Sequence, residues 1–129
     1  MVKSLHPTTI EVTTDERLTE KGDCIVGVGA TKGCGQLSET LKTALRSNQA
    51  RVLIRILVDE ESFEVAAEGD MELQLSHPHD IVIRKSRFIS DRTLAVGASA
   101  AARDIPRSIV SMLRNPMSVG VLEIEVRET

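Results

Sequence analysis

An internal repeat constrains the fold of this chain more than any other feature. The segment His6-Pro7-Thr8-Thr9-Ile10-Glu11-Val12 returns 71 residues later as His77-Pro78-His79-Asp80-Ile81-Val82-Ile83. Further along, residues 24–58 align with residues 92–126 at a constant offset of 68. An alignment that runs through two types of element without a gap is not expected by chance. The sequence therefore predicts one structural unit present twice, as repeats 6–58 and 77–126.

Each repeat predicts the same order of elements: strand, strand, helix, strand. Apolar residues spaced i, i+4, i+7 and i+8 in both copies indicate one face of a helix, and apolar residues at alternate positions indicate strands. The helix faces are formed by Leu37, Leu41, Ala44 and Leu45, and by Ile105, Ile109, Met112 and Leu113. The expected strands are 7–13, 23–29 and 51–58, then 79–85, 92–98 and 118–126, and the expected helices are 36–47 and 104–115.

The segment between the repeats, 59–76, is strongly acidic. It contains seven acidic residues and no basic residue. Apolar residues alternate along both of its arms, and Gly69-Asp70 lies where a tight turn is needed. This pattern predicts a β-hairpin that joins the two repeats.

The two units are expected to form one domain, 1–129. A unit of about 50 residues would be marginally stable alone and would leave one face of its sheet uncovered. We therefore predict an α+β fold, a single pseudo-twofold domain built from two β-β-α-β repeats joined by a β-hairpin. The sheet is expected to be mostly antiparallel or barrel-like, with two covering helices.

Composition excludes several classes of function. The chain has 16 basic and 19 acidic residues, no Trp, no Tyr and two Phe, which argues against a strongly basic nucleic-acid binder or an aromatic stacking platform. No apolar run approaches the roughly 20 residues of a membrane span, and residues 1–4 form no apolar signal core, so we expect no membrane association and a cytoplasmic protein. No cofactor is predicted. Because the net charge of −3 comes from the hairpin, the two repeats are mildly basic and an anion-binding face remains open.

Long strings in both repeats carry a resemblance to a known family. They are 8–13, 18–19 and 22–27 in the first repeat, and 77–78, 80–86, Phe88 and 92–95 in the second. With these strings the chain resembles an archaeal family of uncharacterised proteins, domain of unknown function 371, over nearly its whole length. The strand-to-helix turns of that family usually read Ala-Asp-Lys-Ala, whereas here they are Ala30-Thr31-Lys32-Gly33 and Ala98-Ser99-Ala100-Ala101. The resemblance implies no assigned activity, and if these turns carry a symmetric active site, this member has lost half of it.

Two groups of residues are candidates for binding an anion. Lys32 and Gly33 lie in a glycine-rich segment, 27–35, that leads from a strand to a helix and matches neither a P-loop nor a dinucleotide fingerprint. Arg84, Lys85 and Ser86 follow the first strand of the second repeat, and Arg92 begins the next strand. Glycines that relieve backbone strain and solvated turn charges explain the same patterns. Together these residues predict a binding module for a phosphate-bearing ligand, a nucleotide or an RNA backbone.

The three histidines offer an alternative function. His6 and His77 are equivalent in the two repeats, and Asp23 is a nearby carboxylate, so these three are candidates for acid–base catalysis in a small enzyme whose site crosses the pseudo-twofold axis. His77 and His79 would face the same side of a strand, as metal ligands often do, although no third ligand is evident and no metal is predicted. A His-Pro turn that begins a strand is the simpler explanation.

Two further observations complete the candidates. Cys34 precedes the expected helix, a position that lowers the pKa of a thiol, and no base is located beside it. The turn after the first strand is acidic in the first repeat (13–16) and basic in the second, so pairing between copies would give a homo-oligomeric interaction protein. A monomer and a homo-oligomer both remain open.

Overall fold

The structure is a computed structural model that describes residues 6–14, 25–27, 32–115 and 119–128. Both repeats contain two strands, a short 3₁₀ turn, a helix and a long strand, in the predicted order. In the first repeat these are β1 (Thr9–Thr13), β2 (Ile25–Gly27), the turn Cys34–Gln36, α1 (Glu39–Leu45) and β3 (Ala50–Val58). After β4 (Glu61–Glu68) the second repeat follows with β5 (Asp80–Arg84), β6 (Thr93–Ala95), the turn Ala102–Asp104, α2 (Arg107–Arg114) and β7 (Gly120–Glu128).

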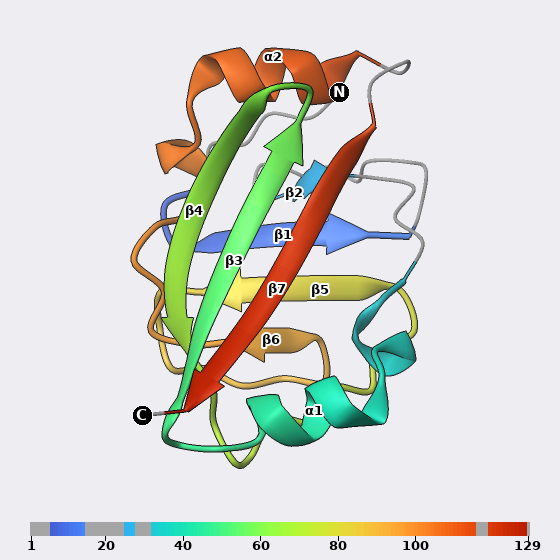
Figure 1. Cartoon of the computed structure of the whole chain (residues 1–129), viewed down its shortest axis with the longest axis vertical. Coiled ribbons are helices and arrows are strands. Elements are labelled where there is room, and N and C mark those ends of the chain that lie inside the picture. Colours follow the sequence, from blue (N-terminus) through green and yellow to red (C-terminus); the bar gives the residue numbers. More distant parts are fainter. Residues whose placement is uncertain (1–5, 15–24, 28–31, 116–118, 129) are drawn as a thin grey trace.

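The described strands form two sheets that cover one another. One sheet has the order β2-β1-β5-β6 and the other the order β4-β3-β7, and in Figure 1 the second sheet crosses in front of the first. Alternate residues of β3, such as Val52 and Ile54, are buried together with Ile10 of β1 and Ile81 and Ile83 of β5. The α+β class is thereby confirmed, but neither sheet of the described chain closes, so the barrel-like alternative is wrong.

The helices lie at opposite ends of the molecule, α2 at the top and α1 at the bottom of Figure 1. Because the two sheets already cover each other's apolar faces, the helices close the ends of the core. Leu45 of α1 and Ile109 of α2 are buried there. Both helices begin later than predicted, because 3₁₀ turns occupy their expected first residues. Ser38 caps α1 by accepting a hydrogen bond from the Leu41 N–H (3.2 Å).

The strand registers reproduce the two offsets of the sequence repeat. In the antiparallel β1–β5 pair Glu11 lies opposite Val82, and in the antiparallel β3–β7 pair Arg55 lies opposite Glu123. Each pair joins equivalent positions of the two repeats. In addition, β2 runs parallel to β1 and β6 runs parallel to β5, with a register shift at the same place in both. A pseudo-twofold axis therefore passes between β1 and β5 in one sheet and between β3 and β7 in the other.

The connecting segment departs from its prediction. Its first arm is β4, which pairs along its whole length with β3 through a turn at Asp59, where φ is 54°. The segment 71–75 forms no strand, so the turn at Gly69-Asp70 is not a hairpin turn. Instead Gly69 approaches the end of α1 so closely that a Cβ atom would overlap the Leu45 carbonyl oxygen. Glycine is needed here for close packing against a helix end rather than for a reversal of the chain.

Candidate functional site

The predicted anion-binding residues lie in two separate groups. Arg84, Lys85 and Ser86 are at the carboxyl end of β5. Arg92 lies at its amino end, because β6 runs parallel to β5 and the Val82 N–H donates to the Arg92 carbonyl oxygen (2.8 Å). Gly33 also lies at that end, in contact with the backbone of Pro78 and His79, and the exposed Lys32 precedes it. The six residues do not converge on one site.

Arg92 is committed to an internal ion-pair network. Its Nη1 atom lies 3.1 Å from Glu11 Oε1 and 3.0 Å from Asp80 Oδ2. The Glu11 side chain is 9% exposed and that of Asp80 14%, so the guanidinium compensates two largely buried carboxylates. At the equivalent positions the other repeat has Val82 and Thr9, which carry no charge. This network joins β1, β5 and the start of β6, and we assign it to the stability of the sheet.

Arg84 is also engaged within the protein. Its Nε atom donates to Thr93 Oγ1 (2.9 Å), its Nη2 atom donates to Ser90 Oγ (3.2 Å), and its guanidinium lies 4.9 Å from the ring centroid of Phe88. Ser86 Oγ accepts a hydrogen bond from the Phe88 N–H (3.3 Å). Of the predicted group at this end, the exposed Lys85 is the side chain best able to meet a ligand.

The histidines cap the starts of two strands. His77 Nδ1 accepts hydrogen bonds from the N–H groups of His79 (3.1 Å) and Asp80 (2.9 Å), and His6 Nδ1 accepts from those of Thr8 and Thr9 (both 3.2 Å). The β1–β5 register places His6 and His77 at opposite ends of the strand pair. They are therefore not brought together, and Asp23 lies outside the described residues.

The described residues include no metal-ligating cluster of three or more His, Cys, Asp or Glu side chains. The rings of His77 and His79 lie edge to face, with centroids 6.2 Å apart. His77 Nε2 lies 3.9 Å from Asp80 Oδ2. Both residues belong to the turn that begins β5, so this contact is part of that turn.

Cys34 is a buried thiol rather than an activated one. Its Sγ atom donates to the Arg92 carbonyl oxygen (3.3 Å), and its side chain belongs to the core. Burial raises the pKa of the thiol to about 12, with a smaller contribution from the negative charge of Asp80. The expectation of a lowered pKa is wrong, because desolvation exceeds the effect of the short turn that follows Cys34.

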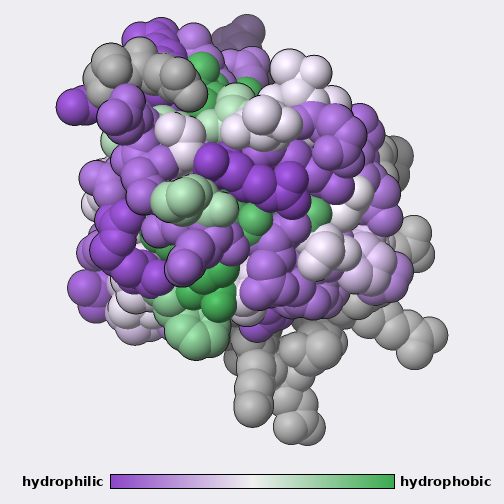
Figure 2. Space-filling model, turned by 90° about the horizontal axis from the view of Figure 1, so that it is seen from below, coloured by the Kyte–Doolittle hydropathy of each residue, from purple (hydrophilic) through white to green (hydrophobic). Residues whose placement is uncertain are grey.

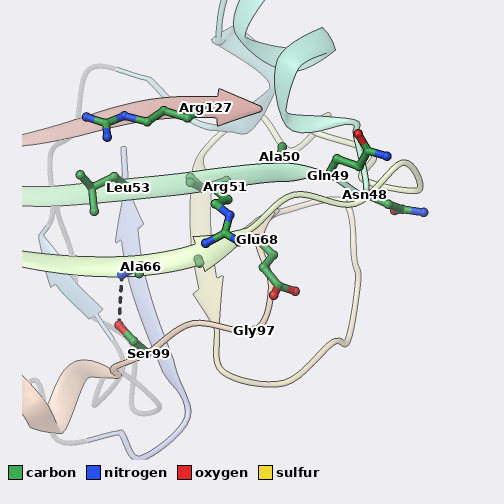
Figure 3. A pocket seen from close by; sticks show the side chains of 12 residues that line it. Asn48, Gln49, Ala50, Arg51, Leu53, Ala66, Glu68, Gly97, Ser99 and Arg127 are labelled. Atoms are coloured by element: carbon green, nitrogen blue, oxygen red, sulfur yellow. Dashed lines mark hydrogen bonds between the residues drawn. The ribbon is translucent and has the colours of Figure 1, made fainter. Parts of the chain in front are cut away.

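An open pocket lies where β3 begins and β4 and β7 end. Its volume is about 610 Å³, within the range of small-molecule sites. The start of β3 forms its floor, and the segment that holds Gly97 and Ser99 borders the edge of β4, where the Ala66 N–H donates to Ser99 Oγ (3.0 Å; Figure 3). The lining residues are Asn48, Gln49, Ala50, Arg51, Val52, Leu53, Ala66, Ala67, Glu68, Gly97, Ser99 and Arg127.

Two arginines of this pocket occupy directly opposite positions on neighbouring strands, although Figure 3 shows the Arg127 side chain extending along β7 and that of Arg51 pointing toward β4. Arg51 of β3 and Arg127 of β7 are directly opposite in the register, and like charges in such a pair are unfavourable. Arg127 is bound to Glu125 on its own strand (3.1 Å), and this hydrogen bond lowers the pKa of the Glu125 carboxyl. Arg51 is exposed and has no hydrogen-bond or ion-pair partner within the described ranges. It is thus a cation available to a ligand.

The centre of the same sheet face is saturated with internal ion pairs. Arg55 contacts Glu64 (2.7 Å), Glu123 (2.8 Å) and Glu125 (3.3 Å) on the two flanking strands. These hydrogen bonds, above all the one that Arg55 donates to Glu64, raise the pKa of the guanidinium further above its ordinary value. Arg55, in the middle of β3, therefore has a structural role, whereas Arg51, near the start of the same strand, has a guanidinium without internal partners among the described residues.

Comparison with known proteins decides the family. The model of the family described as "Domain of unknown function (DUF371)" matches residues 1–127. A relative, the uncharacterized protein MJ0206 of Methanocaldococcus jannaschii, is 41% identical over 113 residues, which cover 88% of this chain and 83% of the relative. The chain belongs to the DUF371 family. The resemblance noted in the sequence is thereby confirmed.

The described part of the first strand-to-helix turn, Lys32-Gly33, and the second turn, 98–101, lie at different ends of the first sheet. Gly33 packs near the start of β5, whereas the Ala98 N–H donates to the carbonyl oxygen of Arg84 at the end of β5 (2.9 Å). They do not share one site. The second turn, however, contributes Ser99 to the pocket.

Sequence reasoning missed the pocket arginines of this DUF371 chain. Arg51 aligns with Val119, and Arg127 lies just beyond the aligned residues 92–126, so neither is part of a repeated motif. Their proximity follows from the β3–β7 register, which pairs the first residues of one strand with the last of the other. The available signal was the alternation of β3, which puts Arg51 on the face opposite the core.

No helix in the described part of the chain is long and apolar enough to cross a membrane.

Proposed function

We propose that this protein is a binding domain for a small phosphate-bearing ligand of nucleotide size, which occupies the pocket at Arg51. The observation that carries the proposal is an exposed arginine without a partner in the described structure, directly opposite a second arginine and on the floor of a 610 Å³ pocket. An anion bound by Arg51 gains charge-assisted hydrogen bonds from a guanidinium that has no internal partner in the part of the chain that the structure describes, and the neighbouring Arg127 can add to them when it exchanges Glu125 for the ligand.

The second arginine is able to join the ligand at small cost. Arg127 is held by Glu125 in an exposed ion pair, with 67% of the arginine side chain accessible. Such pairs contribute little to stability, so exchange of a carboxylate for a phosphate is readily reversible. Asn48 and Gln49 also line the pocket, at the turn before β3, and Leu53 and Ala66 add apolar lining. This mixture suits a phosphate ester with an apolar or aromatic portion.

The alternatives have less support. A shared acid–base site at His6 and His77 requires a proximity that the β1–β5 register opposes. Homo-oligomerisation through opposed turns rests on residues 13–16, of which the two acidic ones, Asp15 and Glu16, lie outside the described ranges. Hydrophilic residues also dominate the face seen from below in Figure 2, where hydrophobic residues are set among them. A charged ligand suits that surface better than a large apolar interface.

We further propose that the two repeats arose by duplication of one β-β-α-β unit. Support comes from the equal offsets in the sequence and in the strand registers.

Calorimetric titration tests the proposed ligand class. Pyrophosphate and ADP are titrated into the protein at about physiological ionic strength, with adenosine as the ligand that lacks phosphate. We expect Arg51→Gln to raise the Kd for pyrophosphate about tenfold, equivalent to one charge-assisted hydrogen bond, and Arg127→Gln to raise it severalfold. Arg114→Gln, an exposed position at the end of α2, is the matched charge control and leaves the Kd unchanged.

The proposal is overturned if neither phosphate compound binds, or if Arg114→Gln weakens binding as much as Arg51→Gln. Tight binding of a short RNA in place of ADP, with the Arg51 dependence retained, would assign the same cation to an RNA backbone. In that case the slope of log K against log salt should fall by about 1 in Arg51→Gln.

A further inference from the structure

Glu68 is the nearest potential partner of Arg51 in the sheet, yet it is bound elsewhere. The two residues lie directly opposite each other in the β3–β4 register, where opposite charges ordinarily pair. Instead, Glu68 Oε2 accepts a hydrogen bond from Arg87 Nη1 at 2.6 Å. Figure 3 shows the Glu68 side chain pointing away from Arg51. The freedom of Arg51 therefore depends on a third residue outside the pocket.

The backbone around Arg87 holds this contact in place. The segment that contains Val96 pairs with the end of β4 through two hydrogen bonds with Glu68 (2.8 and 3.0 Å). The next residue, Gly97, has φ of 59° and donates its N–H to the Ser86 carbonyl oxygen (3.1 Å), beside Arg87. A Cβ atom on Gly97 would lie 3.2 Å from Arg87 Nη1 and 3.3 Å from Glu68 Oε2. Glycine thus leaves room for the ion pair as well as adopting a left-handed conformation.

We infer that Arg87 is a positioning residue for anion binding: it holds the Glu68 carboxylate away from Arg51 and so keeps that guanidinium available. This inference rests on the proposed function. When Arg87 is removed, Glu68 is free to turn to the cation opposite it in the sheet. The carboxylate then competes with the ligand for Arg51, although Arg87 itself need not touch the ligand. Asp70, 3.8 Å from Arg87 Nη2, keeps the guanidinium at this position.

A double-mutant cycle tests the inference with pyrophosphate as the probe. We expect Arg87→Gln to raise the Kd about fivefold or more. Glu68→Gln changes the Kd by at most about twofold in the wild-type background but lowers it by about fivefold in the Arg87→Gln background, because only there is the carboxylate a competitor. Arg87→Lys retains the ion pair and most of the affinity. A simple loss of positive charge near the pocket predicts additive effects instead.

The outcomes separate this inference from the proposed function. If wild-type protein binds no pyrophosphate, the proposed function fails and the inference with it. If Arg51→Gln abolishes binding while Arg87→Gln leaves it unchanged, or if the effects of Arg87→Gln and Glu68→Gln are additive, the inference alone fails. Both side chains are more than half exposed, so the variants are expected to fold, and thermal unfolding followed by circular dichroism verifies this.

Discussion

The buried thiol of Cys34 predicts a loss of stability at alkaline pH that its replacement by alanine should remove. The thiol pKa is about 12 in the folded protein and 9.0 when unperturbed. The folded state therefore keeps a proton that the unfolded state releases. The stabilising contribution is fully present below about pH 9 and is lost as the pH rises toward about 12.

The magnitude follows from the size of the shift. One pKa unit corresponds to about 1.4 kcal/mol, so a shift of three units gives about 4 kcal/mol in full. At pH 10, one unit above the unfolded value, about 1.4 kcal/mol of it is already lost. Cys34→Ala is a suitable comparison, because Ala102 occupies the equivalent position of the second repeat and is equally buried.

Urea unfolding of both proteins at pH 8, 9 and 10 measures this effect. The chain has no Trp and no Tyr, so far-ultraviolet circular dichroism is the appropriate signal, and no tyrosine titration complicates the alkaline range. Lysines and Cys24 are common to both proteins and cancel in the difference. We expect the stability difference between the two proteins to change by about 1.4 kcal/mol between pH 8 and 10. A constant difference, or rapid alkylation of Cys34 in the folded protein at pH 8, would refute the assignment of a buried neutral thiol.

Two further predictions concern the His-Pro turn of the second repeat. His77→Ala should reduce the free energy of unfolding by roughly 1–2 kcal/mol, since two backbone N–H groups lose their acceptor. His77→Asn should restore about half of that free energy, because a short amide oxygen accepts the same hydrogen bonds. Equal stability of the alanine and asparagine variants in urea unfolding would contradict this capping role. Gly33→Ala should cost about 2 kcal/mol, because its Cβ would lie 2.7 Å from backbone atoms of the His-Pro turn. The equivalent Ala101 already carries that methyl group, so Ala101→Gly is the control and should reduce the free energy of unfolding by about 1 kcal/mol. A Gly33→Ala protein as stable as the wild type would show that the turn shifts to accommodate the methyl group and would contradict the prediction.

The sequence predicted the architecture because repetition carries information over long distances. Local periodicity identified the helices and strands, and the offsets of 71 and 68 return in the strand registers that place Glu11 opposite Val82 and Arg55 opposite Glu123. The connecting segment was harder, because a Gly-Asp pair serves equally well as a hairpin turn or as a close contact with a helix end. Only tertiary packing against Leu45 distinguishes the two.

The candidate site was less predictable for a physical reason. A basic string in a sequence does not reveal which of its members are neutralised inside the protein. Arg84 and Arg92 both have internal partners, one among hydroxyl groups and one between carboxylates. Arg51, by contrast, stands alone in the sequence and becomes conspicuous only once the strand register sets Arg127 opposite it.

The pocket lies where the pseudo-twofold symmetry is broken. The strand β4 has no counterpart in the second repeat among the described residues, and it contributes Ala66 and Glu68 to the pocket. The opposite end of the β3–β7 pair is flanked by Asp59 and Val119, so it lacks the two cations. Symmetric pairs such as Arg55 and Glu123 instead join the two repeats across the centre of the outer sheet face. A scaffold of two similar halves thus supplies stability, and the inserted acidic strand, with Arg87 holding its last glutamate, gives one end of the sheet the open pocket in which we propose that a ligand binds.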